Sequence, residues 1–134
     1  MKERVYGFKV FRESGRPLYG NKKWRWAGKY LPTPARLGAW TPPRRRLQTC
    51  RSGWHIGSLA EARGLRAIYP LPLVFIAEAD GRIIFGGSTQ LVAERIRLIE
   101  RVKPTDTLGE VALRYKIPMK WLFDDIDDTK DPTP

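Results

Sequence analysis

Alternation of hydrophobic and polar positions predicts one strand near the start of the chain and another in its second half. Residues 4–12 alternate imperfectly and predict an opening strand. Residues 95–102 alternate charged and apolar side chains, a pattern typical of a strand with one buried face. We expect Ile96, Leu98 and Val102 to share that buried face.

A continuous apolar run at residues 73–79 predicts a further strand in the middle of the chain. A shorter apolar run follows at residues 82–85. Asp80-Gly81 separates the two runs, and this dipeptide is typical of two-residue hairpin turns, because both central positions of such a turn take a positive φ. The pattern therefore predicts a hairpin centred on Asp80 and Gly81.

Two capping boxes predict the starts of helices. In a capping box, a Ser or Thr hydroxyl and a Glu carboxylate three residues later accept hydrogen bonds from each other's free backbone amides. Residues 58–61 have this form and predict a helix over about residues 59–67. Residues 107–110 have it at the start of a second helix that we expect to end near Tyr115, and a third can follow over residues 119–123.

These elements predict an α+β fold with a mixed, mainly antiparallel sheet and one short helix. Residues 1–103 form a basic α+β domain in this prediction, and residues 104–123 form a small two-helix C-terminal appendage. Residues 32–43 contain four prolines and Gly38, which favour a long, irregular, solvent-facing loop. Residues 124–134 hold five Asp side chains and few apolar ones, so we expect an acidic disordered tail.

The length and composition of the chain are those of one folded domain. The chain has 134 residues, of which 42% are hydrophobic, enough for a core without covalent staples. Cys50 is the only cysteine, which excludes an internal disulfide, and with His55 it offers too few ligands for a zinc site. We expect no metal, no cofactor and no membrane span, and a cytoplasmic location.

Charge divides the chain unevenly. Residues 1–60 hold 14 Lys and Arg side chains against two acidic ones, a net of +12, whereas residues 61–134 hold 11 against 12, a net of −1. The first part also carries nine of the fifteen aromatic side chains. Guanidinium groups pair with phosphate or carboxylate, and exposed rings stack on bases. The pattern indicates an anionic partner, either nucleic acid or an acidic surface of a host or virion protein.

The candidate contact residues are the cations and tryptophans of this first part. They are Lys22, Lys23, Trp24, Arg25, Trp26, Lys29, Arg36, Arg44, Arg45, Arg46 and Arg51. Arg and Trp dominate binding hot spots, so we expect Trp24, Trp26 and the three consecutive arginines to be the anchors. The alternative interpretation is a solvated basic surface over tryptophans that belong to the core.

Two segments resemble known families. Residues 102–122 resemble the first half of a LysM module, a glycan-binding fold with two helices against two strands. More diffusely, residues 5–102 are similar to a group of small uncharacterised bacteriophage proteins, through the motif Cys50-Arg-Ser-Gly-Trp-His55, the opening residues 6–9 and the strand segments that follow. This resemblance implies a phage accessory protein located in the host cytoplasm or in the virion.

The same order of elements is similar to the latter half of small ADP-ribosyltransferase folds. That resemblance implies an alternative function as a transferase that uses NAD, with Tyr30, His55 and Glu78 near the pocket. A third hypothesis is a structural virion component, in which residues 32–43 and the acidic tail become ordered only against neighbouring proteins.

Overall fold

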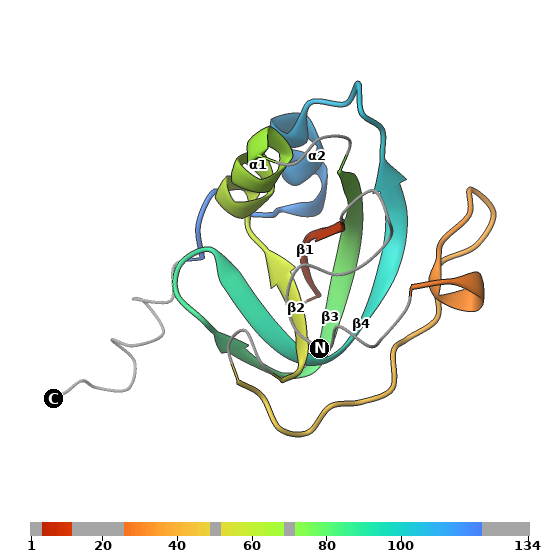
Figure 1. Ribbon diagram of the computed structural model, residues 1–134, viewed down its shortest axis with the longest axis vertical. Helices are drawn as coiled ribbons and strands as arrows, with labels where there is room; N and C mark the ends of the chain where they lie inside the picture. The colour runs from red at the N-terminus through yellow and green to blue at the C-terminus, as the bar shows by residue number, and fades with distance from the viewer. Residues whose placement is uncertain (1–3, 12–25, 49–51, 69–71, 122–134) are drawn as a thin grey trace, which may run out of the picture.

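A computed structural model describes residues 4–11, 26–48, 52–68 and 72–121 of the chain (Figure 1). The elements, in order, are β1 (Val5–Phe11), a short 3-10 helix η1 (Gly28–Tyr30), β2 (Trp54–Gly57), α1 (Leu59–Ile68), β3 (Leu73–Phe85), β4 (Gln90–Val102) and α2 (Leu108–Tyr115). The four strands form a closed barrel in the order β1-β2-β4-β3, and every pairing between them is antiparallel. The predicted α+β class is confirmed.

The barrel is built around the long β3–β4 pair. β1 pairs with β3 along its whole length, and the shorter β2 pairs with β4 at residues 90–93. A single register pair, Phe8 with Gly57, closes the barrel between β1 and β2. This closure needs glycine, because a Cβ on Gly7 would lie 2.9 Å from the carbonyl oxygen of Gly57.

The predicted hairpin at Asp80-Gly81 is wrong. β3 continues through both residues, and a register shift between Asp80 and Ile83 marks a β-bulge there. Gly81 has a φ of 84°, the positive value that the dipeptide signals, but a bulge uses this conformation as readily as a turn does. The chain reverses instead at residues 86–89, where Gly87 has a φ of 109°.

Two apolar clusters lie on opposite faces of the strands. The interior cluster fills the barrel and includes Phe11, Trp26, Trp54, Phe75, Leu91, Ile96 and Leu98. The outer cluster packs the opposite face under α1 and α2 and includes Phe8, Val10, Val74, Ile76, Leu59, Leu108 and Val111. Val102, expected beside Ile96 and Leu98, lies in the outer cluster, because a register shift at Ile76/Ala77 changes the alternation.

The helix predictions are partly confirmed. α1 and α2 lie side by side at one end of the barrel (Figure 1). Ser58 Oγ accepts a hydrogen bond from the Glu61 amide at 3.4 Å, but the Glu61 carboxylate accepts one from Gln90 Nε2 instead of completing the capping box. At α2, the Thr107 side chain makes no capping bond.

The appendage contains one helix where two were predicted. Residues 119–121 form no helix, and Trp121 turns back to pack against Phe85, with 5.9 Å between the ring centroids. Residues 122 and 123 and the acidic tail lie outside the described residues. The predicted second helix is therefore wrong over the residues that the structure describes.

The proline-rich segment is irregular, as predicted, but it is not simply exposed to solvent. We call residues 32–46 the arm. Within it, the amides of Gly38, Thr41 and Arg44 donate hydrogen bonds to β4 carbonyl oxygens, at 2.8, 2.9 and 2.7 Å. Thr41 is only 2% exposed. The arm therefore runs antiparallel along β4, beyond the point where β2 ends.

Replacement of Gly53 by Ala should destabilise the fold. Gly53 has a φ of 96°, and a Cβ there would lie 2.4 Å from Val92 Cγ1, so strain and overpacking add. We expect Gly53→Ala to lower the free energy of unfolding by about 2–4 kcal/mol in urea titrations. The control is Gly64→Ala in α1, where a Cβ meets nothing within 4 Å and should stabilise by about 0.5–1 kcal/mol. Equal effects of the two changes would contradict the prediction.

Candidate functional site

Five of the candidate contact residues lie outside the described residues. They are Lys22, Lys23, Trp24, Arg25 and Arg51. Trp26 belongs to the interior cluster, where its ring lies 5.5 Å from Phe11 and 5.7 Å from Trp54. In this position it supports the barrel, and its ring is not available to stack on a partner.

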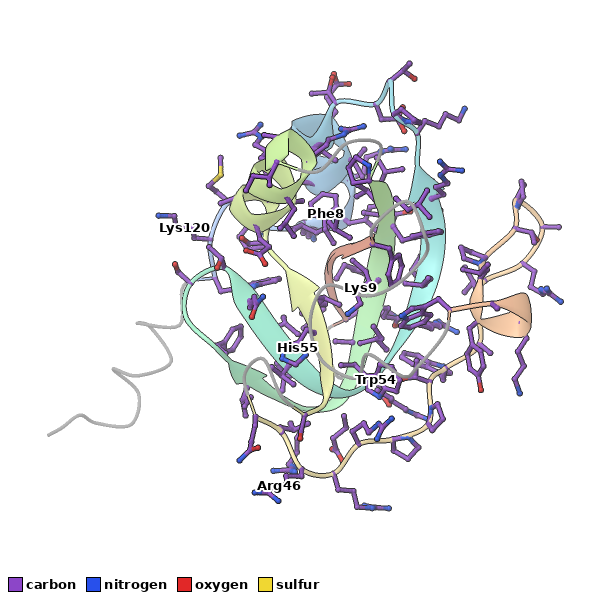
Figure 2. The ribbon with its side chains drawn as sticks, in the orientation of Figure 1. Phe8, Lys9, Arg46, Trp54, His55 and Lys120 are labelled. Carbon is purple, nitrogen blue, oxygen red and sulfur yellow. The ribbon has the colours of Figure 1, made fainter. Side chains whose placement is uncertain are left out.

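The three consecutive arginines lie together at one end of the arm. The guanidinium carbon of Arg44 lies 5.3 Å from the ring centroid of Trp54, while Arg45 and Arg46 are exposed. Arg82, on the bulged part of β3, donates a hydrogen bond to the carbonyl oxygen of Arg45. These four side chains form what we call the arginine edge, and Figure 2 shows Arg46 at the end of the barrel opposite the two helices.

The charge of the arginine edge is largely uncompensated. Among the described residues, no carboxylate lies within 4.0 Å of the guanidinium nitrogens of Arg44, Arg45 or Arg46. Arg82 has only a long ion pair with Glu94, at 3.9 Å, and its own side chain is 64% exposed. Such an exposed ion pair contributes little energy, so the arginine edge presents a concentrated positive charge to solvent.

The positive charges beside the middle of the arm are compensated by carboxylates. The Trp40 ring lies 5.0 Å from the guanidinium carbon of Arg95 and 4.6 Å from that of Arg97. Arg95 pairs with Asp80 at 2.7 Å, and Arg97 pairs with the buried carboxylate of Glu78 at 2.9 Å. These two arginines therefore hold Trp40 and the arm in place, and their charges are neutralised locally.

Lys29 and Arg36 lie toward the other end of the arm, and both are exposed. The Lys29 ammonium lies 5.4 Å from the Tyr30 ring centroid. The backbone carbonyl oxygen of Lys29 accepts a hydrogen bond from the Ala39 amide. The arginine run therefore lies beside Arg82 at one end of the arm, whereas Arg36 lies toward its other end and Lys29 lies just before the arm.

A buried amine is the second chemically distinct feature. Lys9 is 5% exposed, and its Nζ donates a hydrogen bond to the carbonyl oxygen of His55 at 2.8 Å (Figure 2). Burial lowers the pKa of Lys9 to about 7. Burial, together with the positive charge of Lys9, lowers the pKa of His55 to about 4. The imidazole is therefore neutral at physiological pH.

The cavity beside this amine is too small for an organic substrate. It has a volume of about 20 Å³ and is lined in part by Lys9, His55, Glu61 and Gln90. That volume suits about one water molecule. Two separate hydrogen bonds border it, from Lys9 to the His55 carbonyl oxygen and from Gln90 to the Glu61 carboxylate, and this cavity has no room for a larger molecule.

The three residues suggested for an NAD pocket do not share this cavity. His55 lines it, but Tyr30 and Glu78 do not. The Glu78 carboxylate is engaged by Arg97 at 2.9 Å and by Arg4 at 3.7 Å, and Tyr30 packs against the interior cluster. The geometry therefore gives no specific support to an NAD-dependent transferase.

Comparison with known proteins leaves the geometry as the main guide to function. A scan against protein-family models found no match, and neither a search of curated proteins nor a search of solved structures found one. No helix in the described part of the chain is long and apolar enough to cross a membrane. The same residues contain no group of three or more side chains suited to hold a metal ion.

Replacement of Lys9 by Met should stabilise the protein in a pH-dependent way. The pKa of Lys9 falls from 10.5 to about 7 on folding, so the unfolded chain binds one more proton between these values, and stability rises with pH across that window. We expect Lys9→Met to be more stable than the wild type by up to about 4 kcal/mol at pH 6, with the gain shrinking toward pH 10.

The measurement is urea unfolding at several pH values between 6 and 10. Lys120→Met, at an exposed lysine, is the control and should change the free energy of unfolding by less than about 0.5 kcal/mol throughout. A difference between Lys9→Met and the wild type that is constant across this range would contradict the prediction.

Proposed function

We propose that this chain is a small phage-type accessory protein that binds nucleic acid through the arginine edge, in the cytoplasm of the host cell. The observation that carries the proposal is the cluster of Arg44, Arg45 and Arg46 on a backbone fixed to β4, without carboxylate partners among the described residues. The phage origin is supported by the resemblance described for the sequence.

Phosphate is the partner chemistry that suits this surface best. Guanidinium groups bind phosphate through paired, charge-assisted hydrogen bonds. The hydrogen bond from the Arg44 amide to the Glu94 carbonyl oxygen, at 2.7 Å, holds the run in place before any partner arrives. A preformed surface loses less conformational entropy on binding than a mobile one does.

The distribution of apolar side chains favours nucleic acid over an acidic protein surface. Protein interfaces usually have an apolar or aromatic centre surrounded by a polar rim. The large apolar side chains that are exposed in the described residues are Leu37, Ile68, Leu113 and Met119, and none of them belongs to the arginine edge. Phosphate contacts need no such centre, because counterion release supplies much of the binding free energy.

Removal of the arginine run should weaken binding in a salt-dependent way. We expect the triple variant Arg44→Ala, Arg45→Ala, Arg46→Ala to bind a labelled oligonucleotide about 10- to 100-fold more weakly at low salt, with a shallower salt dependence, because up to three phosphate contacts disappear. Fluorescence anisotropy from about 25 to 300 mM salt measures both quantities, on single-stranded and duplex DNA and RNA.

A charge-matched triple variant is the control. Arg63→Ala, Arg114→Ala, Lys120→Ala removes three exposed cations on the helical side of the molecule and should weaken binding far less. Equal losses in the two triple variants, or no binding by the wild type at low salt, would refute the proposal. Binding of polyglutamate as tightly as of nucleic acid would favour an acidic protein surface instead.

A further inference from the structure

A groove of about 520 Å³ lies between the proline turn of the arm and the end of β4. It is lined by Pro32, Thr33, Pro34, Glu100, Arg101, Lys103 and Pro104. This volume falls within the range of about 300–1,000 Å³ that is typical of small-molecule sites. None of these residues belongs to the arginine edge.

The walls of the groove are stiff. Thr33 and Arg36 exchange two backbone hydrogen bonds, at 2.8 and 3.1 Å, and Thr33 Oγ1 accepts a third bond from the Ala35 amide at 3.3 Å. Proline rings fix φ at Pro32 and Pro34 on one side and at Pro104 on the other. The groove therefore presents apolar rings on a backbone that is held in one shape.

The cations of the groove are free to meet a ligand. Arg101 and Lys103 are both exposed, and no carboxylate of the described residues lies within 4.0 Å of their side-chain nitrogens. The Asp106 carboxylate accepts a hydrogen bond from the Lys103 backbone amide, at 3.0 Å. Residues two apart in an extended chain share a face, so both side chains lie on one side of the end of β4.

The only carboxylate among the lining residues, that of Glu100, points to the face of β4 opposite Arg101 and Lys103. Glu100 precedes Arg101, so the alternation of the strand turns its side chain the other way, where it accepts a hydrogen bond from the Tyr115 hydroxyl. Burial raises the pKa of Tyr115 to about 12, and the bond to Glu100 adds to the effect, so the hydroxyl keeps its proton and remains a donor. The lining as a whole keeps one net positive charge.

The groove and the arginine edge lie at the two ends of one seam. The arm pairs with β4 at Glu94, Ile96 and Leu98, and the groove continues this line at residues 100–104. At about 3.3 Å per residue, the strand from Glu94 to Arg101 spans roughly 23 Å. A span of this length accommodates several nucleotides of an extended single strand.

We propose that the groove holds the base and phosphate of one nucleotide of a single-stranded nucleic acid that also contacts the arginine edge. The proline rings pack against the faces of the base, and Arg101 and Lys103 bind the adjoining phosphate. A base in a duplex is paired and stacked on its neighbours, so only an unpaired base enters the groove. This inference rests on the proposed function and adds a preference for single strands to it.

The test compares single-stranded and duplex oligonucleotides of the same sequence. We expect Arg101→Ala, Lys103→Ala to bind the single strand about tenfold more weakly than the wild type, and to bind the duplex no more than about threefold more weakly. Arg114→Ala, Lys120→Ala removes the same charge from exposed positions elsewhere and should change either affinity by less than about threefold.

The outcomes separate this inference from the proposed function. If the arginine triple variant loses binding but the groove variant keeps its single-strand affinity, the groove proposal is overturned and the proposed function stands. Equal losses on single strand and duplex in the groove variant would also overturn it, because they indicate a general electrostatic effect.

A second measurement tests the groove directly. Titration of the wild type with adenosine monophosphate, followed by amide chemical shifts, should move the resonances of Thr33, Arg101 and Lys103 and be abolished in the groove variant. No shift at these residues at millimolar nucleotide would overturn the groove proposal, even where oligonucleotides bind. If these three resonances shift with adenosine monophosphate but the protein binds no oligonucleotide, the proposed function is refuted. The proposal that one nucleic-acid strand contacts both the groove and the arginine edge is then refuted too.

Discussion

The hydrogen bonds between Thr41 and Ile96 determine where the candidate surfaces lie. β2 covers the outer edge of β4 only at residues 90–93, and the backbone groups beyond that point need other partners. Thr41 supplies two of them: its amide donates to the Ile96 carbonyl oxygen at 2.9 Å, and its Oγ1 accepts from the Ile96 amide at 3.0 Å. The proline-rich arm thereby pairs with β4 where an edge strand would, and this pairing fixes the charged ends of the arm relative to the barrel.

Local neutralisation distinguishes the cations beside the middle of the arm from those at its ends. Glu78 and Asp80 neutralise Arg97 and Arg95 in the middle of the arm, where Trp40 packs on both guanidinium groups. The described acidic side chains leave the arginine run and the end of β4 without close partners. Along the described part of the arm, the uncompensated positive charge therefore lies toward its two ends and not at its middle.

Local sequence signals predicted the elements that depend on local contacts, and missed those that depend on distant ones. Alternation located β1 and β4, and the Ser58 capping position located α1. Asp80-Gly81 signalled a positive φ correctly, but its use in a bulge depends on the pairing of β3 with β4. The pairing of the arm with β4 joins residues about 55 positions apart and has no periodic pattern, so only the folded chain reveals the arginine edge and the groove.

Lys9 shows the same limit of local sequence signals. Alternation in β1 places Lys9 on the interior face with Phe11, although a lysine is normally read as exposed. A barrel of four strands is narrow enough for its own side chains to fill it. The cavity of about 20 Å³ beside the amine is lined by Lys9 and His55 together with side chains that pack under α1, so it lies between the strands and this helix. The amine that this packing encloses is bonded to the His55 carbonyl oxygen, so Lys9 contributes to the pH dependence of stability and not to the exposed basic surface.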